Sequence, residues 1–303
     1  MDSFLTAFFS GTSQGAIYAL VSLGLVLVWR GAGVVNFAQM GQAMFTTYIA
    51  SQLIQNNYSY WSAFVIALIS GAILGAIVDL GLMRPLTSRK NSQLLNSQSM
   101  RTTIPVIASL GILGVLKSLA GIFWAGEERG FPTPVPANSI KIGSTNLAIT
   151  GFDLFVIGVV FITLVLTTIF FTKTGMGLAM RASALNPEVT RLSGIKVGSV
   201  RTLGWAISGT ASSLAGLLIT PKTNLSPNTL DLLLIVGFTA AVVGGLTSLA
   251  GSVLGGFIVG YVIAFVNVYG APENVFIAIL VFLLLALFIR PQGILGSKEV
   301  RRV

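Results

Sequence analysis

The residue types that usually perform covalent chemistry are scarce in this 303-residue chain. It contains no His and no Cys, which removes the commonest general base, thiolate nucleophiles and the commonest metal ligands. The stretch from Gly111 to Ser118 imitates a phosphate-binding loop, but Leu116 replaces the second glycine and the whole stretch lies in an apolar run. We therefore expect no enzyme, no metal site and no cofactor. If ATP drives the protein, a separate chain must hold the nucleotide.

Polar amides inside apolar sequence indicate a different chemistry, the passage of a polar solute. Asn36, Gln39 and Gln42 lie in the run 34–54, where each amide would be costly facing lipid. We expect these side chains to face the interior of a helical bundle, where uncharged amides can hydrate a solute without trapping it. The alternative role is an interhelical hydrogen bond that holds the bundle together.

Lys117 is the fourth candidate pathway residue, because a cation inside an apolar run costs about 2.5 kcal/mol or more. Its candidate partners are Asp79, the only acidic residue well inside a predicted span, and the carboxylate of a passing solute. Depth in the membrane disfavours Asp79, which can instead pair locally with Arg84. The alternative is that Lys117 extends its ammonium group to the outer headgroups.

The elements that must position these residues are membrane-spanning helices. The chain is 54% hydrophobic and 9% charged, with a mean hydropathy of +0.88, whereas a soluble domain is about one quarter charged. The sequence predicts an all-α, polytopic transmembrane bundle of eight or nine spans that forms one domain over residues 1–303. Whether the segments 34–54 and 232–269 cross completely or partly re-enter stays open. The candidate spans are 12–29, 34–54, 62–83, 103–125, 152–172, 202–220, 232–249, 251–269 and 274–289.

Basic residues predict the orientation of the bundle. They gather in the segments 84–101, 173–201 and 290–302, which the positive-inside rule assigns to the cytoplasm. The N-terminus is then outside and the C-terminus is cytoplasmic. This rule explains the net charge of +9 better than nucleic-acid binding does, so we expect membrane lipid and no nucleic acid as a partner. The exterior loop 126–151 contains three prolines, and we expect it to be irregular and able to receive a partner from outside.

The basic segment 173–201 contains a predicted short helix. Asn186 can cap it, Pro187 occupies its first position, and Glu188 meets the positive end of the helix dipole. Gly194 is the expected stop. Such a helix can dock sideways into a groove of another protein, or it can lie on lipid headgroups. Its predicted apolar stripe consists of Val189, Leu192 and Ile195.

Glycines near the C-terminal end form two overlapping rows of small residues. One row contains Gly251 and Gly255, and the other contains Gly256 and Gly260. Rows of this kind allow helix backbones to approach closely. They predict either plain helix packing or a role in lining the translocation path.

Five segments of the chain resemble, in the expected order, motifs of the LivH-type permeases. These proteins are the membrane subunits of branched-chain amino acid ABC importers. Each segment alone is a weak signal, whereas five in order are specific. The segments are Gly31 to Gln39, Asp79 with Arg84-Pro85-Leu86, Gly177 to Ile195, Gly244 to Gly256, and Arg290 to Gly296.

The resemblance implies a heterodimer with a second, homologous permease, two ABC ATPase subunits and a periplasmic or extracellular substrate-binding protein. It also implies a multi-pass protein of the prokaryotic plasma (inner) membrane that imports neutral or branched-chain amino acids into the cytoplasm. The residues that couple to the ATPase would lie in the cytoplasmic coupling loop 173–201. They are Arg181, Ala182, Asn186, Pro187, Glu188, Leu192 and Gly194.

Departures from the family's pattern leave the solute open. Met40, Lys117 and Ile263 stand where the family usually has Gly, Gln and Glu. The first alternative is a urea or short-amide permease, although those relatives usually carry an additional N-terminal region. The second is a secondary transporter or channel without ATPase subunits, which would be expected to use membrane carboxylates. Between Arg201 and Arg290 the sequence offers few charges, all in predicted loops.

Overall fold

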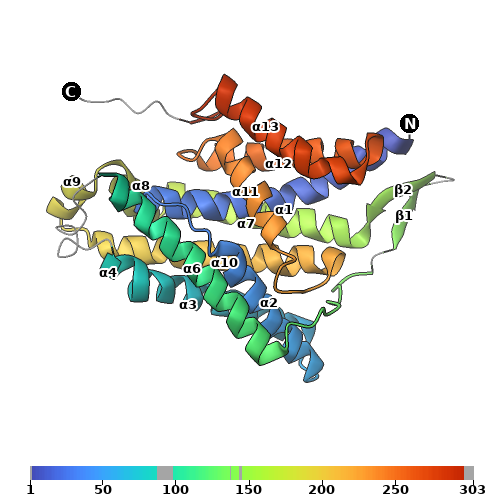
Figure 1. Cartoon of the computed structure of the whole chain (residues 1–303), viewed down its shortest axis with the longest axis horizontal. Helices are drawn as coiled ribbons and strands as arrows, with labels where there is room; N and C mark the ends of the chain where they lie inside the picture. Colours follow the sequence, from blue (N-terminus) through green and yellow to red (C-terminus); the bar gives the residue numbers. More distant parts are fainter. Residues whose placement is uncertain (1, 87–97, 137, 143–144, 297–303) are drawn as a thin grey trace. The chain divides into compact units, whose positions relative to one another are not determined.

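The protein is described by a computed structural model of the chain, which covers residues 2–86, 98–136, 138–142 and 145–296 (Figure 1). Its residues divide into two compact units whose chain segments interleave. The first unit contains Met1–Val26, Pro132–Leu164 and Ile235–Val303. The second unit contains Leu27–Phe131 and Val165–Leu234.

The first unit is built from helices and one hairpin. It holds most of α1 (Asp2–Ala32), the strands β1 (Ser139–Ile142) and β2 (Thr145–Thr150), and the first part of α7 (Gly151–Lys173). It also holds most of α11 (Asp231–Gly244), then α12 (Leu249–Tyr269), the short 3-10 helix η2 (Pro272–Asn274) and α13 (Val275–Ile289).

The second unit begins with the end of α1, from Leu27, which is followed by α2 (Gln39–Gln55). It continues with α3 (Tyr60–Val78), which runs through the π-helical turn η1 (Asp79–Met83) into α4 (Arg84–Leu86). It then contains α6 (Gln98–Trp124), the short helices α8 (Gly175–Leu185) and α9 (Pro187–Leu192), and α10 (Val197–Thr223).

Seven helices in the described part of the chain are long and apolar enough to cross a membrane, and they coincide with seven of the nine predicted runs. The other two predicted runs form the shorter helices α2 and α11, of 17 and 14 residues. A complete crossing takes about 20 residues. A helical membrane bundle is therefore confirmed, while full crossing by α2 and α11 stays a prediction.

Polar side chains start several helices at the points where the apolar runs are interrupted. Ser59, Thr174 and Ser248 cap α3, α8 and α12, and each hydroxyl accepts the N–H three residues further on at 3.0 to 3.2 Å. These bonds satisfy backbone donors that have no partner inside the helix.

The two glycine rows of α12 pack against different helices of the first unit. Gly251 and Gly255 face α11, where an added Cβ would meet backbone atoms. Gly256 and Gly260 face α1, and a Cβ on Gly256 would collide with the backbone of Ala19. Close helix packing, one of the two predicted roles, is therefore what these glycines perform.

Small residues also let α10 pack closely against α2 and α3 in the second unit. A Cβ on Gly75 of α3 would collide with the carbonyl group of Trp205, which is itself buried in α10. On another face of α10, a Cβ on Gly216 would lie 2.7 Å from the hydroxyl of Thr47 in α2. Helix α10 is therefore the central element of this unit, and it places α2 and α3.

The prediction of an irregular loop over 126–151 was wrong for its second half. There β1 pairs with β2 in an antiparallel hairpin, with Lys141 opposite Asn146. The three prolines that suggested irregular structure end at Pro136 and do not reach the strands. Both strands keep their N–H donors, so the ladder can form.

Candidate functional site

The connection between α1 and α2 is a break in the helix that carries a buried amide. Gly33 has a φ of +68°, a left-handed conformation that glycine adopts without strain. The side-chain oxygen of Asn36 then accepts the N–H of Ala38 at 3.0 Å. Asn36 is fully buried, and its Nδ2 has no hydrogen-bond partner among the described residues.

Buried polar side chains continue along one face of α2. Gln39, Gln42 and Thr46 follow one another at helical spacing, and all three are fully buried. The hydroxyl of Thr46 donates to Ser213 on α10 at 2.8 Å, so this part of the face is directed toward α10. The prediction that these amides face the interior of the protein is confirmed.

Gln42 is the least satisfied of these side chains. Neither its Nε2 nor its Oε1 has a hydrogen-bond partner within the part of the chain that the structure describes. The alternative role of an interhelical hydrogen bond is therefore not one that Gln42 performs here. A primary amide can donate two hydrogen bonds and accept two, and leaving them unmade in a buried site is costly. The arrangement suits a site whose remaining partner is water or a polar solute.

Lys117 has a partner that sequence reasoning missed. Its Nζ lies 2.5 Å from Oδ2 of Asp231 and 3.0 Å from Oδ1 of Asn228. Asp231 begins α11, where the helix dipole favours a negative charge. Asp79, which membrane depth disfavoured as a partner, is thus not the partner of Lys117, and its place is taken by a carboxylate that was predicted to lie in a loop. Contact of Lys117 with a passing solute stays a prediction. The charge of Lys117 is compensated by a partly exposed ion pair, in which the side chains of Lys117 and Asp231 are 24% and 45% exposed.

Asp79 is the centre of a second charged cluster, and it is fully buried. Local pairing with Arg84 is observed, but at 3.9 Å it is the longer of two ion pairs. The shorter pair joins Oδ1 of Asp79 to Nε of Arg201 at 2.8 Å. The hydroxyl of Thr202 donates to Oδ2 at 2.6 Å, and Arg84 donates to the carbonyl of Gly198 at 2.6 Å.

This charged cluster therefore joins the π-helical turn η1 to the first turns of α10. The sequence motif predicted the pairing of Asp79 with Arg84. No sequence pattern predicted that Arg201 would be the nearer partner. A π turn inside a longer helix is often found at functional positions.

The predicted short helix is present as α9, and its start follows the expected chemistry. The side-chain oxygen of Asn186 accepts the N–H groups of Glu188 and Val189 at 3.1 Å each, and Pro187 is the first helical residue. Gly194, after the helix end, has a φ of +81°. Asn186 also donates its own N–H to the carbonyl of Ala182 at 3.0 Å, which closes the corner between α8 and α9.

The corner presents large apolar side chains to its surroundings. Leu185 and Leu192 are 87% and 88% exposed, and Val189 is 56% exposed. We call these three exposed apolar side chains at the corner the docking face (Leu185, Val189, Leu192). Arg181, the remaining predicted coupling residue, lies on α8 and is partly buried. Figure 1 shows α8 and α9 in the connection between α7 and α10.

Comparison with known proteins gives the family of the chain. The family model described as the permease component of branched-chain amino acid transport systems matches residues 7–288. The high-affinity branched-chain amino acid transport permease BraD of Pseudomonas aeruginosa is 28% identical, and the alignment covers 99% of this chain and 98% of BraD.

Two further relatives carry a similar description. The permease LivH of Salmonella typhimurium is 28% identical over 99% of this chain and 98% of its own length. The probable branched-chain amino acid transport permease LivH of Methanocaldococcus jannaschii is 30% identical over 95% of this chain and 91% of its own length. On these matches, the chain belongs to the permease family of branched-chain amino acid transport systems.

Proposed function

We propose that this chain is the membrane permease subunit of an ATP-driven importer that brings neutral or branched-chain amino acids into the cytoplasm. The observation that carries the proposal is the docking face at the corner of α8 and α9. Exposed apolar side chains within a basic, polar segment call for a partner with an apolar groove. An ATPase subunit is that partner, since the chain itself carries no recognisable nucleotide-binding motif.

The complete importer would contain this chain, a second homologous permease, two ATPase subunits and an external substrate-binding protein. The relatives support this composition because their names describe permease proteins of transport systems. The basic segments favour an orientation with the N-terminus outside and the C-terminus in the cytoplasm, in a prokaryotic plasma or inner membrane. The docking face then lies on the side where ATP is available.

The buried amides of the second unit would form part of the solute pathway. Asn36, Gln39 and Gln42 can each donate to a carboxylate and accept from an ammonium group without carrying a charge. A neutral amino acid has both a carboxylate and an ammonium group. Uncharged amides can bind these groups without a strong charge–charge attraction that would slow release. Lys117 would act through its ion pair with Asp231 as a gate residue, and not by holding the solute.

The substitution Gln42→Leu is expected to reduce transport without weakening the fold. It should lower solute uptake at least about tenfold, a loss of about 1.4 kcal/mol of solute or transition-state binding. The thermal stability of the purified protein should stay the same or rise, because the change removes a buried amide without partners. Uptake and the unfolding temperature would be measured on the same preparation.

The matched control is Thr47→Val on the same helix. Thr47 is equally buried, but its hydroxyl donates to the carbonyl of Ala43 within α2. Uptake by this variant should remain close to the unmodified level. A Gln42→Leu protein with normal uptake and a lower unfolding temperature would assign Gln42 to the scaffold of the bundle instead of the pathway.

The proposed function is tested by ATPase activity of the complex purified through a tag on this chain and placed in lipid discs. The substrate-binding protein would be supplied empty or loaded with leucine, alanine, glutamine or urea. Stimulation by a loaded amino acid supports the proposal and names the solute class, whereas stimulation by urea alone replaces it with the urea-permease alternative. If no ATPase co-purifies and the chain alone moves solute in vesicles, a secondary transporter becomes the function.

A further inference from the structure

The docking face is joined to α10 by a very short connection. Only the residues 193–196 separate the end of α9 from the start of α10. The N–H of Ile195 donates back to the carbonyl of Thr190 at 3.3 Å, and Thr190 is buried. On α8, the side chain of Met180 lies against α10, since a Cβ on Gly204 would be 3.3 Å from its Cε. A displacement of the docking face is therefore expected to displace the first turns of α10.

The first turns of α10 are held to the end of α3 by the side chain of Arg84. Its Nη2 donates to the carbonyl of Gly198 at 2.6 Å and to the hydroxyl of Thr202 at 2.7 Å. These two acceptors lie one turn apart on α10. A close backbone contact between α3 and α10, at Gly75 and Trp205, lies about two turns further along α10 than Gly198. Arg84 thus extends the contact between the two helices to the first turn of α10.

Arg84 contributes little to the charge balance of the buried cluster. Asp79 is already paired with Arg201 at 2.8 Å, whereas Arg84 lies 3.9 Å from the same carboxylate. The side chain of Arg84 is also 41% exposed, and ion pairs of exposed residues usually contribute little to stability. The main effect of Arg84 is therefore to fix the position of the first turn of α10 against the π-helical turn.

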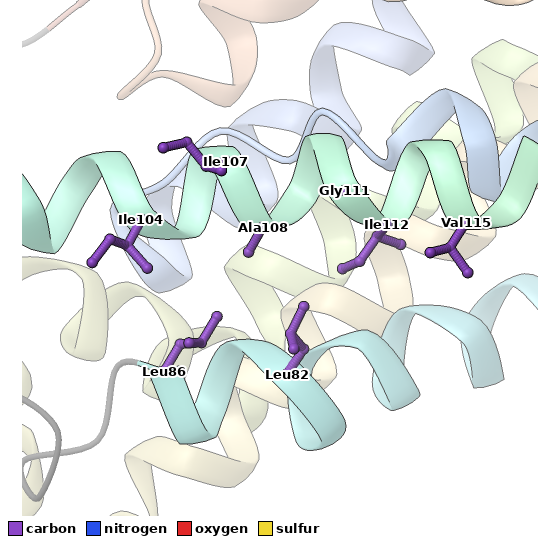
Figure 2. Close-up of a pocket in the computed structure, with 8 residues that line it drawn as sticks. All are labelled: Leu82, Leu86, Ile104, Ile107, Ala108, Gly111, Ile112 and Val115. Atoms are coloured by element: carbon purple, nitrogen blue, oxygen red, sulfur yellow. The ribbon is translucent and has the colours of Figure 1, made fainter.

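The segment that carries Arg84 has little support on its other side. Leu82 and Leu86 lie two positions before and after Arg84, on the opposite side of the helix, and Figure 2 shows them pointing toward α6. A cavity of about 480 Å³ with an apolar lining lies between these two side chains and α6. The backbone N–H of Arg84 donates to the carbonyl of Asp79 and closes the π turn. The segment has room on the side of α6, and the contact of Arg84 with α10 fixes its position.

We propose that Arg84 is a positioning residue that couples ATP hydrolysis to transport. This inference rests on the proposed function, because it takes an ATPase subunit to be bound at the docking face. A movement of the docking face would shift the first turn of α10, and Arg84 would carry η1 and α3 with it. Without Arg84, the first turn of α10 would move alone, and ATP would be hydrolysed with little movement of the bundle around the buried amides.

The test compares Arg84→Gln with the unmodified complex in lipid vesicles. The binding protein would be supplied with labelled leucine, alanine, glutamine and urea, and solute uptake and ATP hydrolysis would be measured on the same vesicles. The ATPase subunits should co-purify and stay active, because the docking face is intact. The amount of solute moved per ATP should fall at least about fivefold, which is the size of a typical coupling between distant sites.

Two further variants separate coupling from a general loss of charge. Arg84→Lys should recover part of the solute moved per ATP, because its ammonium group has three donors on a shorter side chain. Arg290→Gln is the matched control, since it removes the same group from an exposed position in the other unit. This control should keep the ratio of solute to ATP of the unmodified complex.

The unfolding temperature of Arg84→Gln should fall by less than about 2 °C, because the lost contacts are partly exposed. An unchanged ratio of solute to ATP would overturn the role of Arg84 and leave the proposed function intact. A large fall in the unfolding temperature, with uptake and hydrolysis lost in proportion, would assign Arg84 to the stability of the fold. If the unmodified complex contains no ATPase, or takes up none of the four solutes, the proposed function itself fails.

Discussion

Replacing Leu192 with Asp is expected to lower solute uptake at least about tenfold and to remove the ATPase subunits from the purified complex. Leu192 belongs to the docking face and is 88% exposed on α9. A buried leucine anchor at a protein interface contributes about 2 kcal/mol when it is a central contact, and an aspartate would in addition bring an unpaired charge into an apolar groove. Uptake and ATPase co-purification would be measured at matched membrane levels.

The control for this prediction is Ser193→Asp, which adds the same charge at the neighbouring exposed position and leaves the docking face intact. It should retain ATPase subunits and most of the uptake. The amount of Leu192→Asp in the membrane should be unchanged, because so exposed a side chain contributes little to folding. Normal uptake by Leu192→Asp would contradict docking and favour a helix that lies on lipid headgroups.

Removing the charge of Asp79 is expected to produce the largest loss of stability. Asp79→Asn would leave Arg201, whose side chain is only 17% exposed, without the carboxylate that lies 2.8 Å from it. Breaking a buried ion pair on one side costs about 3 to 5 kcal/mol. We expect the unfolding temperature in detergent to fall by roughly 5 to 10 °C, with a matching loss of protein from the membrane.

A double-mutant cycle with Arg201→Met separates this pair from a general effect of substitution. Asp79→Leu combined with Arg201→Met removes both charges and should recover much of the unfolding temperature, because apolar pairs of similar volume can replace buried ion pairs. The single changes Asp79→Leu and Arg201→Met should each be destabilising on their own. If the double variant is no more stable than the sum of the two single effects predicts, the ion pair does not hold η1 to α10.

The family resemblance rested on motifs whose structural roles differ from one another. The segment from Gly31 to Gln39 breaks a helix and buries an amide, and the run from Gly244 to Gly256 brings α12 against its neighbours. The closing segment from Arg290 to Gly296 returns to α11, where the N–H of Ile294 donates to the carbonyl of Val243 at 2.8 Å. Several of these positions have a left-handed backbone or lie very close to a neighbouring helix, and glycine is the residue that fits both conditions.

The sequence by itself determined the features that depend on neighbouring residues. Hydropathy determined the membrane class and seven of the spans. About 20 consecutive apolar residues in a helix are long enough to cross the bilayer, and the helix satisfies the backbone hydrogen bonds within the hydrocarbon. Capping chemistry determined α9, since Asn186, Pro187 and Gly194 act within one turn of the chain. The burial of Asn36 and Gln42 also followed from local sequence, since an amide in an apolar run avoids lipid.

Only the tertiary structure decided which distant residues become partners. Lys117 and Asp231 are 114 positions apart, and Thr202 and Asp79 are 123 positions apart. No pattern along the chain connects such residues, because their contact depends on which helices small residues allow to pack together. The same holds for the cavity between the η1–α4 segment and α6, whose lining residues come from two separate stretches of apolar sequence. Partner choice and cavity shape are properties of packing, which local sequence does not encode.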